Sequence, residues 1–201
     1  MSVKPDYYDN LDKLHDEIVA KLTRGFLDKK SPYRFFVLST SINNNVNSRM
    51  VVLRNFCSKK WELLLHSDCR SKKFQEIESN RNVSLNFWDP KKSIQLRVKG
   101  KAEKFNETNY YAWSRLNVWS KRTYLTQKKP GSVSTSPISG FSEKFLKIPP
   151  NNEEINIGFK NFCQIKVFIK KIDCLILSRF GYRRALFEIK GDKLNKKWLV
   201  P

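Results

Sequence analysis

The sequence has few of the residues from which metal sites are built. Of its 201 residues, four are cysteines and two are histidines. The cysteines are Cys57, Cys69, Cys163 and Cys174. None of them forms a CxxC pair, and the two histidines, His15 and His66, stand far apart in the chain. Zinc-ligand spacing is therefore absent, and we expect no metal and mostly buried, reduced thiols.

Long apolar runs and the signatures of common enzymes are also missing. No run approaches the length needed to cross a membrane, and residues 1–18 lack the pattern of a signal peptide, so we expect a cytoplasmic protein. The motifs GxSxG, HExxH and GxGxxG and the Walker loop do not occur. No paired carboxylate stands out. The sequence therefore assigns no catalytic side chain, and a cofactor is expected to carry any chemistry.

Positive charge, in contrast, is abundant. The formal net charge is +20, from 39 lysines and arginines against 19 acidic residues. Such an excess suggests nucleic-acid binding, a solvated basic surface that reflects genome composition, or a basic pocket for a phosphorylated small molecule. The cations are spread along the chain and no nucleic-acid-binding signature accompanies them, so the solvated surface is favoured over nucleic acid.

Length and hydropathy predict one folded domain over residues 1–201. Apolar residues make up 40% of the chain, too many for a disordered protein. Within the N-terminal segment 1–30, apolar residues recur at helical spacing from about Asn10 to Phe26 and predict an amphipathic helix. Strand-like segments follow, and the stretches PYRFFVLSTS and RMVVLRNF are joined by an asparagine-rich turn as in a hairpin.

The remaining segments continue this pattern. WELLLHS, NVSLNFWD and SIQLRVKGKAEKF are expected strands, with a short helix after the first, and Gly100 marks a bulge. ETNYYAWSRLNVWSKRTYL is an expected helix, residues 129–160 an expected long loop, and the last strands follow. The order of elements predicts a mainly β protein with flanking helices, built on a closed or partly closed antiparallel barrel.

Two cations bracket the strand RMVVLR. Side chains alternate faces along a strand, so Arg49 and Arg54 are expected on opposite faces and at opposite ends. Burial of an unpaired arginine is costly. Either both side chains reach solvent, or an anion lies beside at least one of them.

A second group of cations lies where a strand gives way to a helix, in SDCRSKK. Arg70, Lys72 and Lys73 surround Ser71 there. Backbone N–H groups at a helix start attract anions, whereas cations at the same place are unfavourable without one. This favours a bound phosphate over a merely solvated first turn. Gln95, on the polar side of its strand, either binds the edge of a heterocycle or is an exposed strand residue.

Taken in order, these segments resemble the pyridoxamine 5′-phosphate oxidase family, the FMN-binding split barrels. RMVVLR resembles the family's Arg-x-x-x-Leu-basic strand, and HSDCRSKKFQEIESNRNVSLNF its strand, Ser-x-Lys turn and helix. QLRVKGKAE resembles its Gln-x-x-x-x-Gly-x-Ala-Glu strand, and the chain ends on a similar Leu-x-Pro. The resemblance covers about Phe35 to Lys104 well and the C-terminal third loosely. It implies a split antiparallel β-barrel and a homodimer with FMN at the subunit interface.

The resemblance also implies roles for individual residues. The implied cofactor-binding residues are Arg49, Met50, Val51, Val52, Leu53, Arg54, His66, Ser67, Lys72, Lys73, Gln95, Gln127 and Arg184. The implied substrate-binding residues are Arg54, Tyr111 and Arg115. Lys72 and Lys73 would hold the cofactor phosphate, and Gln95 would reach the isoalloxazine edge.

The chain departs from the family where substrate is bound. The family's Arg-x-His signature corresponds here to Phe180, Gly181 and Tyr182, so both substrate residues are missing. Leu175 replaces an expected tryptophan, and Arg54 an expected lysine. These changes indicate a divergent branch, in which FMN binding is better preserved than turnover of pyridoxamine phosphate.

The sequence therefore predicts an FMN-dependent oxidase that resembles pyridoxamine 5′-phosphate oxidase and acts on a small, phosphorylated substrate with oxygen as acceptor. The alternatives are an FMN-binding protein with another redox role, such as a flavin reductase or a haem-handling split barrel, and a basic nucleic-acid-binding protein. A homodimer is the expected assembly, with no membrane partner.

Overall fold

The computed structural model describes residues 4–105, 109–191 and 193–201. Strands dominate, with one long helix at the start and several short ones later. In chain order the elements are α1 (Leu11–Leu27), η1 (Pro32–Arg34), β1 (Phe35–Ile42), β2 (Asn45–Val52), β3 (Asn55–Cys57), β4 (Glu62–Asp68), α2 (Lys72–Ser79), β5 (Asn82–Asp89), β6 (Ile94–Phe105), α3 (Asn109–Ser114), α4 (Val118–Arg122), η2 (Glu143–Leu146), α5 (Asn152–Phe159), β7 (Phe162–Ile176), β8 (Arg183–Lys190) and β9 (Lys193–Leu199).

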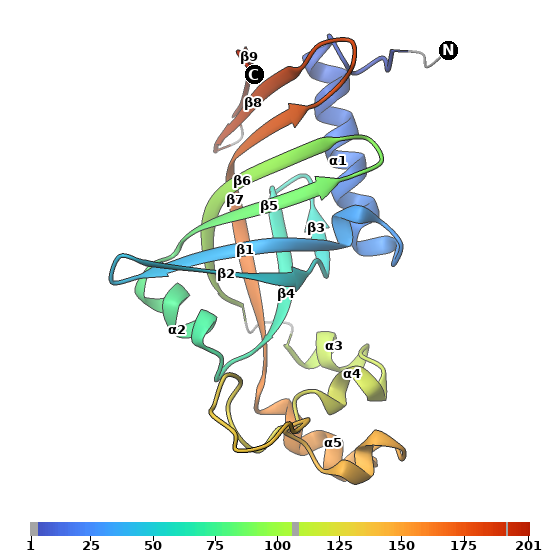
Figure 1. The fold of residues 1–201 in the computed structure, drawn as a ribbon, viewed down its shortest axis with the longest axis vertical. Helices are drawn as coiled ribbons and strands as arrows, with labels where there is room; N and C mark the ends of the chain where they lie inside the picture. Colours follow the sequence, from blue (N-terminus) through green and yellow to red (C-terminus); the bar gives the residue numbers. More distant parts are fainter. Residues whose placement is uncertain (1–3, 106–108, 192) are drawn as a thin grey trace.

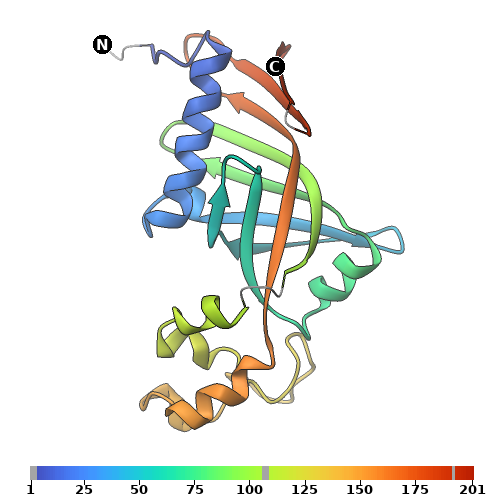
Figure 2. The ribbon, with the colours of Figure 1, turned by 180° about the vertical axis from the view of Figure 1, so that it is seen from behind.

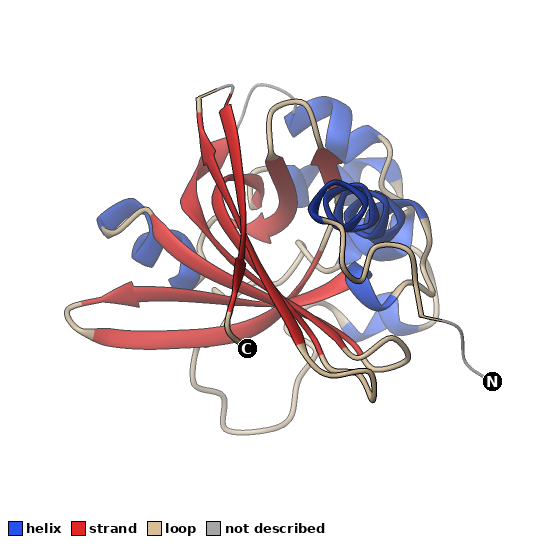
Figure 3. Cartoon of the chain, turned by 90° about the horizontal axis from the view of Figure 1, so that it is seen from above, coloured by secondary structure: helices blue, strands red, loops and turns tan. Residues whose placement is uncertain are grey.

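The strands form one antiparallel sheet that curls into a split barrel. The order of neighbours is β2-β1-β5-β6-β7-β4-β3, and β8 pairs with both β7 and β9. β7 is 15 residues long and is therefore shared between the barrel and the β8–β9 extension. In Figure 1 the β1–β2 pair crosses β4 and β7 at a steep angle. Seen from above, in Figure 3, the strands diverge from one another. The predicted mainly β architecture is confirmed.

The N-terminal helix α1 lies along the side of the barrel, as Figure 2 shows from behind. The Asn10 side chain caps its start by accepting hydrogen bonds from the N–H groups of Asp12 and Lys13. One face of the helix is buried in the core through Leu14, Ile18 and Leu22. The helix predicted from the apolar spacing is therefore confirmed.

Two local backbone features explain how the strands are shaped. Asn43 and Asn44 form the two-residue β1–β2 turn with φ of 48° and 61°, the conformation that asparagine tolerates best among residues with a side chain. The pairing of β6 with β7 shifts at Gly100, as predicted. A Cβ at Gly100 would lie 2.4 Å from the Phe168 carbonyl oxygen, so glycine is required at this close approach.

Short helices occupy the end of the molecule opposite the termini (Figures 1 and 2). The predicted single helix over residues 107–125 is instead α3 and α4, separated near Leu116, and its residues 107 and 108 lie outside the described ones. The predicted loop 129–160 contains η2 and α5, which begins with a capping box at Asn151. These helices pack around a small cluster of their own that includes Trp113, Ile155 and Phe162.

Across residues 4–105, 109–191 and 193–201, none of the helices combines the length and the hydropathy that crossing a bilayer requires.

Candidate functional site

A half-buried lysine marks the point where β4 ends and α2 begins. The Lys73 ammonium lies 3.2 Å from the Ser67 hydroxyl and 3.2 Å from the Ser71 hydroxyl. Among the described residues no carboxylate lies within ion-pair distance of it. Burial, together with the nearby charge of Arg49, lowers the pKa of Lys73. Lys73 is thus a partly desolvated cation with only hydroxyl partners.

The neighbouring cation, Arg49, is already paired. Its Nη2 lies 2.7 Å from Oε2 of Glu76, a residue of α2 with 0% exposure. Thr40 and Asn47 donate further hydrogen bonds to the same carboxylate, at 2.5 and 2.8 Å. Burial raises the pKa of Glu76, but the hydrogen bonds from Thr40 and Arg49 outweigh it, so the net pKa is lowered. The carboxylate therefore stays ionised and anchors β1, β2 and α2 to one another.

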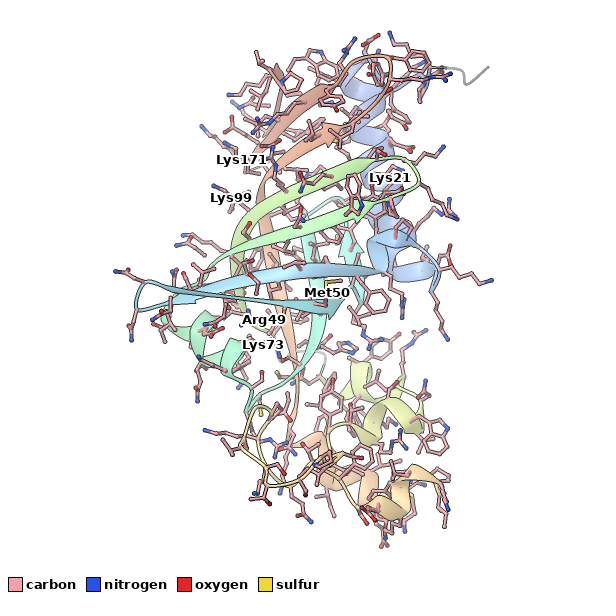
Figure 4. The ribbon with its side chains drawn as sticks, viewed as in Figure 1. Lys21, Arg49, Met50, Lys73, Lys99 and Lys171 are labelled. Carbon is pink, nitrogen blue, oxygen red and sulfur yellow. The ribbon has the colours of Figure 1, made fainter. Side chains whose placement is uncertain are left out.

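The start of α2 adds to the positive potential at this corner. The Ser71 hydroxyl is engaged with Ser67 and Lys73 instead of capping the helix, and its first turn holds no acidic residue. Lys72, the first residue of α2, is exposed. Figure 4 shows Arg49 and Lys73 close together below β2. A helix start with uncapped N–H groups and an unpaired lysine suits a phosphate. We call Arg49, Ser67, Ser71 and Lys73 the anion corner.

A cavity of about 720 Å³ opens on the outer face of β4 and β7. Glu62 and His66 of β4 and Gln164 and Lys166 of β7 form its floor. The end of α1, residue Arg54 and helix α3 close it from the sides. The predicted substrate residues Arg54, Tyr111 and Arg115 all line this cavity. Sequence reasoning placed these three together, and the structure brings them together.

The ionisable side chains that line this cavity differ in their charge. Burial and, to a smaller extent, the charge of Arg54 lower the pKa of His66 to about 4, so the imidazole is neutral at physiological pH. Burial also lowers the pKa of Arg54, with a contribution from Arg34. Lys166 is paired with Glu62 at 3.5 Å. The cavity as a whole keeps an excess of positive charge from two arginines.

Gln95 and Arg184 lie on a different surface, the outer face of β6, β7 and β8. They line a second cavity of about 440 Å³ together with Arg97 and Asp173. Asp173 holds Arg184 through Nε and Nη2, at 3.1 and 2.9 Å, and accepts a hydrogen bond from Arg97 at 3.0 Å. Burial raises the pKa of Asp173, but these two arginines lower it on balance. Arg184 is therefore fixed in orientation by its carboxylate.

The predicted cofactor residues thus fall into separate groups. Among the described residues, the lining of the second cavity shares no member with the first or with the anion corner. Figure 4 shows Lys99 and Lys171, which line the second cavity, well away from Arg49 and Lys73. The predicted cofactor residues of one chain therefore lie on different surfaces.

The other predicted residues differ in exposure. Met50 is 61% exposed on the outer face, and Leu53 lies fully inside the core. Val51 and Val52 are half-buried at the end of β2. Gln127 is held through its backbone, since its N–H donates to Gly140 and its carbonyl accepts from Arg70. Leu53 can therefore offer a ligand only its backbone.

Sequence reasoning missed Glu76 and Asp173, the carboxylates that hold Arg49 and Arg184. Glu76 is buried in α2 together with Phe74 and Ile77, but it stands two residues after the first and one before the second, so helical spacing gave no signal for an inward-facing acid. Asp173 alternates with Cys174 along β7, so it shares the polar face with Lys171. Neither acid has a sequence motif, because each recognises its arginine from a different element.

The loop at the family's substrate motif has another use in this chain. The Tyr8 hydroxyl donates to the Gly181 carbonyl, and Arg183 donates to Asp9 at 2.8 Å. Tyr8 itself is 1% exposed. The β7–β8 loop is thus docked against the residues that precede α1.

The sequence of this chain is similar to those of known proteins. Residues 14–106 match the family described as "Pyridoxamine 5'-phosphate oxidase, FMN-binding domain". The chain is 28% identical over 86 residues to a pyridoxine/pyridoxamine 5'-phosphate oxidase of Trichormus variabilis, a stretch that covers 42% of this chain and 39% of that protein.

The chain resembles the pyridoxamine 5'-phosphate oxidase-like family, in sequence over residues 14–106 and in fold more widely.

Two solved structures show that the family fold extends over the whole chain. A pyridoxamine 5'-phosphate oxidase-related FMN-binding protein of Nostoc punctiforme is 20% identical, with a TM-score of 0.70 over 92% of this chain and 96% of that one. PhzG of Burkholderia lata, solved with tetrahydrophenazine-1-carboxylic acid, is 14% identical, with a TM-score of 0.72 over 100% and 99% of the two chains. The predicted split barrel is confirmed, and FMN is the cofactor of the family.

The residues of the anion corner fit that cofactor. A partly desolvated cation without a carboxylate partner costs free energy, which a bound anion would offset. The uncapped start of α2 adds N–H donors for phosphate oxygens. Lys73 is therefore the side chain best placed to hold a phosphate, with Ser67 and Ser71 beside it.

Proposed function

We propose that this protein is an FMN-dependent oxidoreductase that oxidises a small anionic substrate, with oxygen as the acceptor. The observation that carries the proposal is the anion corner, where Lys73 is half-buried beside Arg49 and at the uncapped start of α2. The family matched over residues 14–106 is described as FMN-binding, and the phosphate of FMN would suit this corner.

The protein's own groups position the reactants. Lys73, with the hydroxyls of Ser67 and Ser71, would hold the FMN phosphate. Arg54 and Arg115 would attract an anionic substrate into the 720 Å³ cavity and hold it in place there. FMN, when bound, is the acceptor for a hydride from the substrate carbon. Neutral His66 adds no second positive charge beside Arg54, so the guanidinium is the cation that would meet the substrate at this end of the cavity.

The function is tested by isolating the protein with its cofactor. We expect a yellow protein with flavin absorbance, one FMN per chain released on denaturation, and oxygen consumption with hydrogen peroxide formation on an active anionic substrate. Pyridoxamine 5'-phosphate is the reference substrate, and we expect slow turnover because Phe180 and Tyr182 stand where the family has arginine and histidine.

Two results would contradict the function. A protein that stays colourless after incubation with FMN would exclude the flavin, and a salt-sensitive shift of DNA by such a protein would favour nucleic-acid binding instead. A yellow protein that is reduced by a nicotinamide but does not pass electrons from any amine or alcohol substrate to oxygen would assign it to the flavin reductases.

The separation of the two groups of cofactor residues supports a homodimer as the active form. Phe35, Met50 and Trp88 are 51%, 61% and 42% exposed and lie on the outer sheet face that also carries Gln95 and Arg184. An exposed apolar patch of this kind is typical of an interface. A second copy against this face would bring its Gln95 and Arg184 to the first copy's anion corner.

Mixing two inactive variants tests this assembly. Lys73→Glu removes one group of residues and Arg184→Glu the other, so each homodimer should lose FMN. After unfolding and refolding together, heterodimers contain one intact site, and random pairing should restore about a quarter of the wild-type FMN occupancy. Recovery is measured from flavin absorbance at a mass twice the 23.7 kDa of one chain. Refolded mixtures that stay colourless, while wild type recovers, would show that one chain provides the whole site.

A further inference from the structure

The charged groups of the 720 Å³ cavity differ in whether they have partners. Glu62 and Lys166 form an ion pair at 3.5 Å. At the rim, the guanidinium of Arg115 donates to the Tyr111 hydroxyl at 2.5 Å and lies 5.4 Å from the centre of its ring. Arg54 and His66 are the exception, because their side chains have buried nitrogens with no hydrogen-bond partner among the described residues.

Arg54 is held in place by its backbone while its charge stays uncompensated. Its N–H donates to the Leu64 carbonyl at 2.8 Å, which fixes the residue against β4. None of the ion pairs formed by the described residues involves its guanidinium, and Nε is buried and unpartnered. Arg34 adds a second positive charge nearby. A half-buried, unpaired guanidinium costs several kcal/mol, so an anion is expected to complete it.

His66 lies on the same face of β4, two residues beyond Leu64. Its ring packs edge-on against Phe162, with the centroids 5.0 Å apart and the planes at 76°. Its Nδ1 is buried and, within the described part of the chain, unpartnered. A neutral imidazole has one N–H donor and one acceptor nitrogen. In the tautomer that carries its proton on the buried Nδ1, the ring offers Nε2 as an acceptor beside the Arg54 cation.

The balance of charge in the cavity favours one negative charge on a ligand over two. Glu62 neutralises the positive charge of Lys166, and the neutral His66 ring adds no charge. Arg115 lies at the exposed rim. A phosphate dianion requires several charged or N–H donors. The anion corner offers such donors, whereas the buried end of this cavity offers the single guanidinium of Arg54.

The shape of the cavity wall restricts the ligand further. Leu64, Phe105 and Leu116 line it between the polar groups. Apolar side chains with few polar groups of fixed position are typical of sites that bind a planar ring and orient it through its substituents. The ring's substituents must then match a cation and an adjacent acceptor.

From this arrangement we infer that the cavity binds an aromatic monocarboxylate that carries an N–H or O–H donor beside the carboxylate. The carboxylate pairs with Arg54 and the donor binds the His66 ring. The claim that such compounds are the ones oxidised rests on the proposed function. The claim that they bind in this cavity depends only on the cavity's residues.

Calorimetric titration of the FMN-loaded full chain tests the inference with three probes: 2-aminobenzoate, benzoate and phenyl phosphate. We expect the Kd of 2-aminobenzoate to be at least tenfold below that of benzoate, since benzoate lacks the donor, and also below that of phenyl phosphate. His66→Phe should erase the difference between the two carboxylates and leave benzoate binding intact. His66→Gln, which keeps an acceptor, should retain part of it.

Arg54→Met should weaken all three probes at least tenfold, whereas Arg24→Met, on the exposed face of α1, should change none of them. Equal affinity for benzoate and 2-aminobenzoate in the wild type, or tightest binding of phenyl phosphate, would overturn the inference. Thermal unfolding of each variant confirms that it is folded.

The outcome separates this inference from the proposed function. A protein that takes up no FMN but shows the expected order of probes refutes the flavin function and supports the site. A protein that holds FMN but binds none of the three probes refutes the site and leaves the flavin function standing.

Discussion

Replacement of Glu76 by alanine is expected to lower the free energy of unfolding by about 3–5 kcal/mol, the cost of removing one partner of a buried ion pair. Glu76 is 0% exposed, and its carboxylate accepts hydrogen bonds from Thr40, Asn47 and Arg49. Without it, the Arg49 charge and two polar groups lose their acceptor. Denaturant unfolding followed by circular dichroism measures the change.

The matched control is Glu78→Ala, on the exposed face of the same helix, which should change stability by less than about 0.5 kcal/mol. Part of the lost free energy of unfolding comes from leaving the Arg49 charge unpaired. A double variant, Glu76→Leu with Arg49→Met, removes both charges and should therefore recover much of that stability. Equal stabilities of the Glu76 and Glu78 variants would show that the buried pair does not anchor α2 to the sheet.

Acid should reveal the same carboxylate. The folded-state pKa of Glu76 is lowered because hydrogen bonds from Thr40 and Arg49 outweigh burial. Its stabilising contribution is therefore complete above the unfolded-state pKa of about 4.3 and is lost as the pH falls through the folded-state value. The Glu76→Ala variant should lose less stability than the wild type over that range, in unfolding measured at a series of pH values.

Lys73→Met is expected to weaken FMN binding by about 2–3 kcal/mol, or roughly 30- to 150-fold in Kd, the effect of losing a charged hydrogen-bond donor to phosphate. Its ammonium already lies between the hydroxyls of Ser67 and Ser71, so it is oriented before any ligand arrives. Burial and Arg49 lower the pKa of Lys73, and a phosphate would relieve that cost. Quenching of FMN fluorescence gives the Kd.

Lys72→Met is the matched control, one residue away and of the same type. Its side chain is exposed at the first position of α2 and needs to be ordered on binding, so we expect a loss of less than about threefold. Riboflavin, which has no phosphate, should bind wild type and Lys73→Met equally. A larger loss with Lys72→Met, or unequal riboflavin binding, would place the phosphate elsewhere.

Much of the barrel was predictable from the sequence because its signals are local. The spacing of Leu14, Ile18 and Leu22 predicts α1, and the pair Asn43–Asn44 predicts the turn between β1 and β2. Gly100 marks the bulge of β6 because no other residue fits against the Phe168 carbonyl. The helical end was predicted less well, since α3 and α4 are short, most of their aromatic residues are exposed, and Trp113 is buried by packing with Ile155 of α5 and Phe162 of β7.

The candidate site was predictable in its parts but not in its grouping. RMVVLR and SDCRSKK locate the cations, and the resemblance to the family in the sequence adds Gln95 and Arg184. The partners of these cations come from elsewhere in the chain: Glu76 lies 27 residues from Arg49, and Asp173 lies 76 residues from Arg97. No local pattern indicates such pairs, which form only when the sheet curls and brings distant strands together.

The sequence by itself determined the strand-rich fold, the positions of the cations and the resemblance to the family, because alternation, turn residues and motif order are properties of neighbouring residues. The tertiary structure alone decided which cations are neutralised and which stay available. Charge compensation depends on distance in space, and a lysine such as Lys73 differs from its neighbour Lys72 only in what the folded chain places around it.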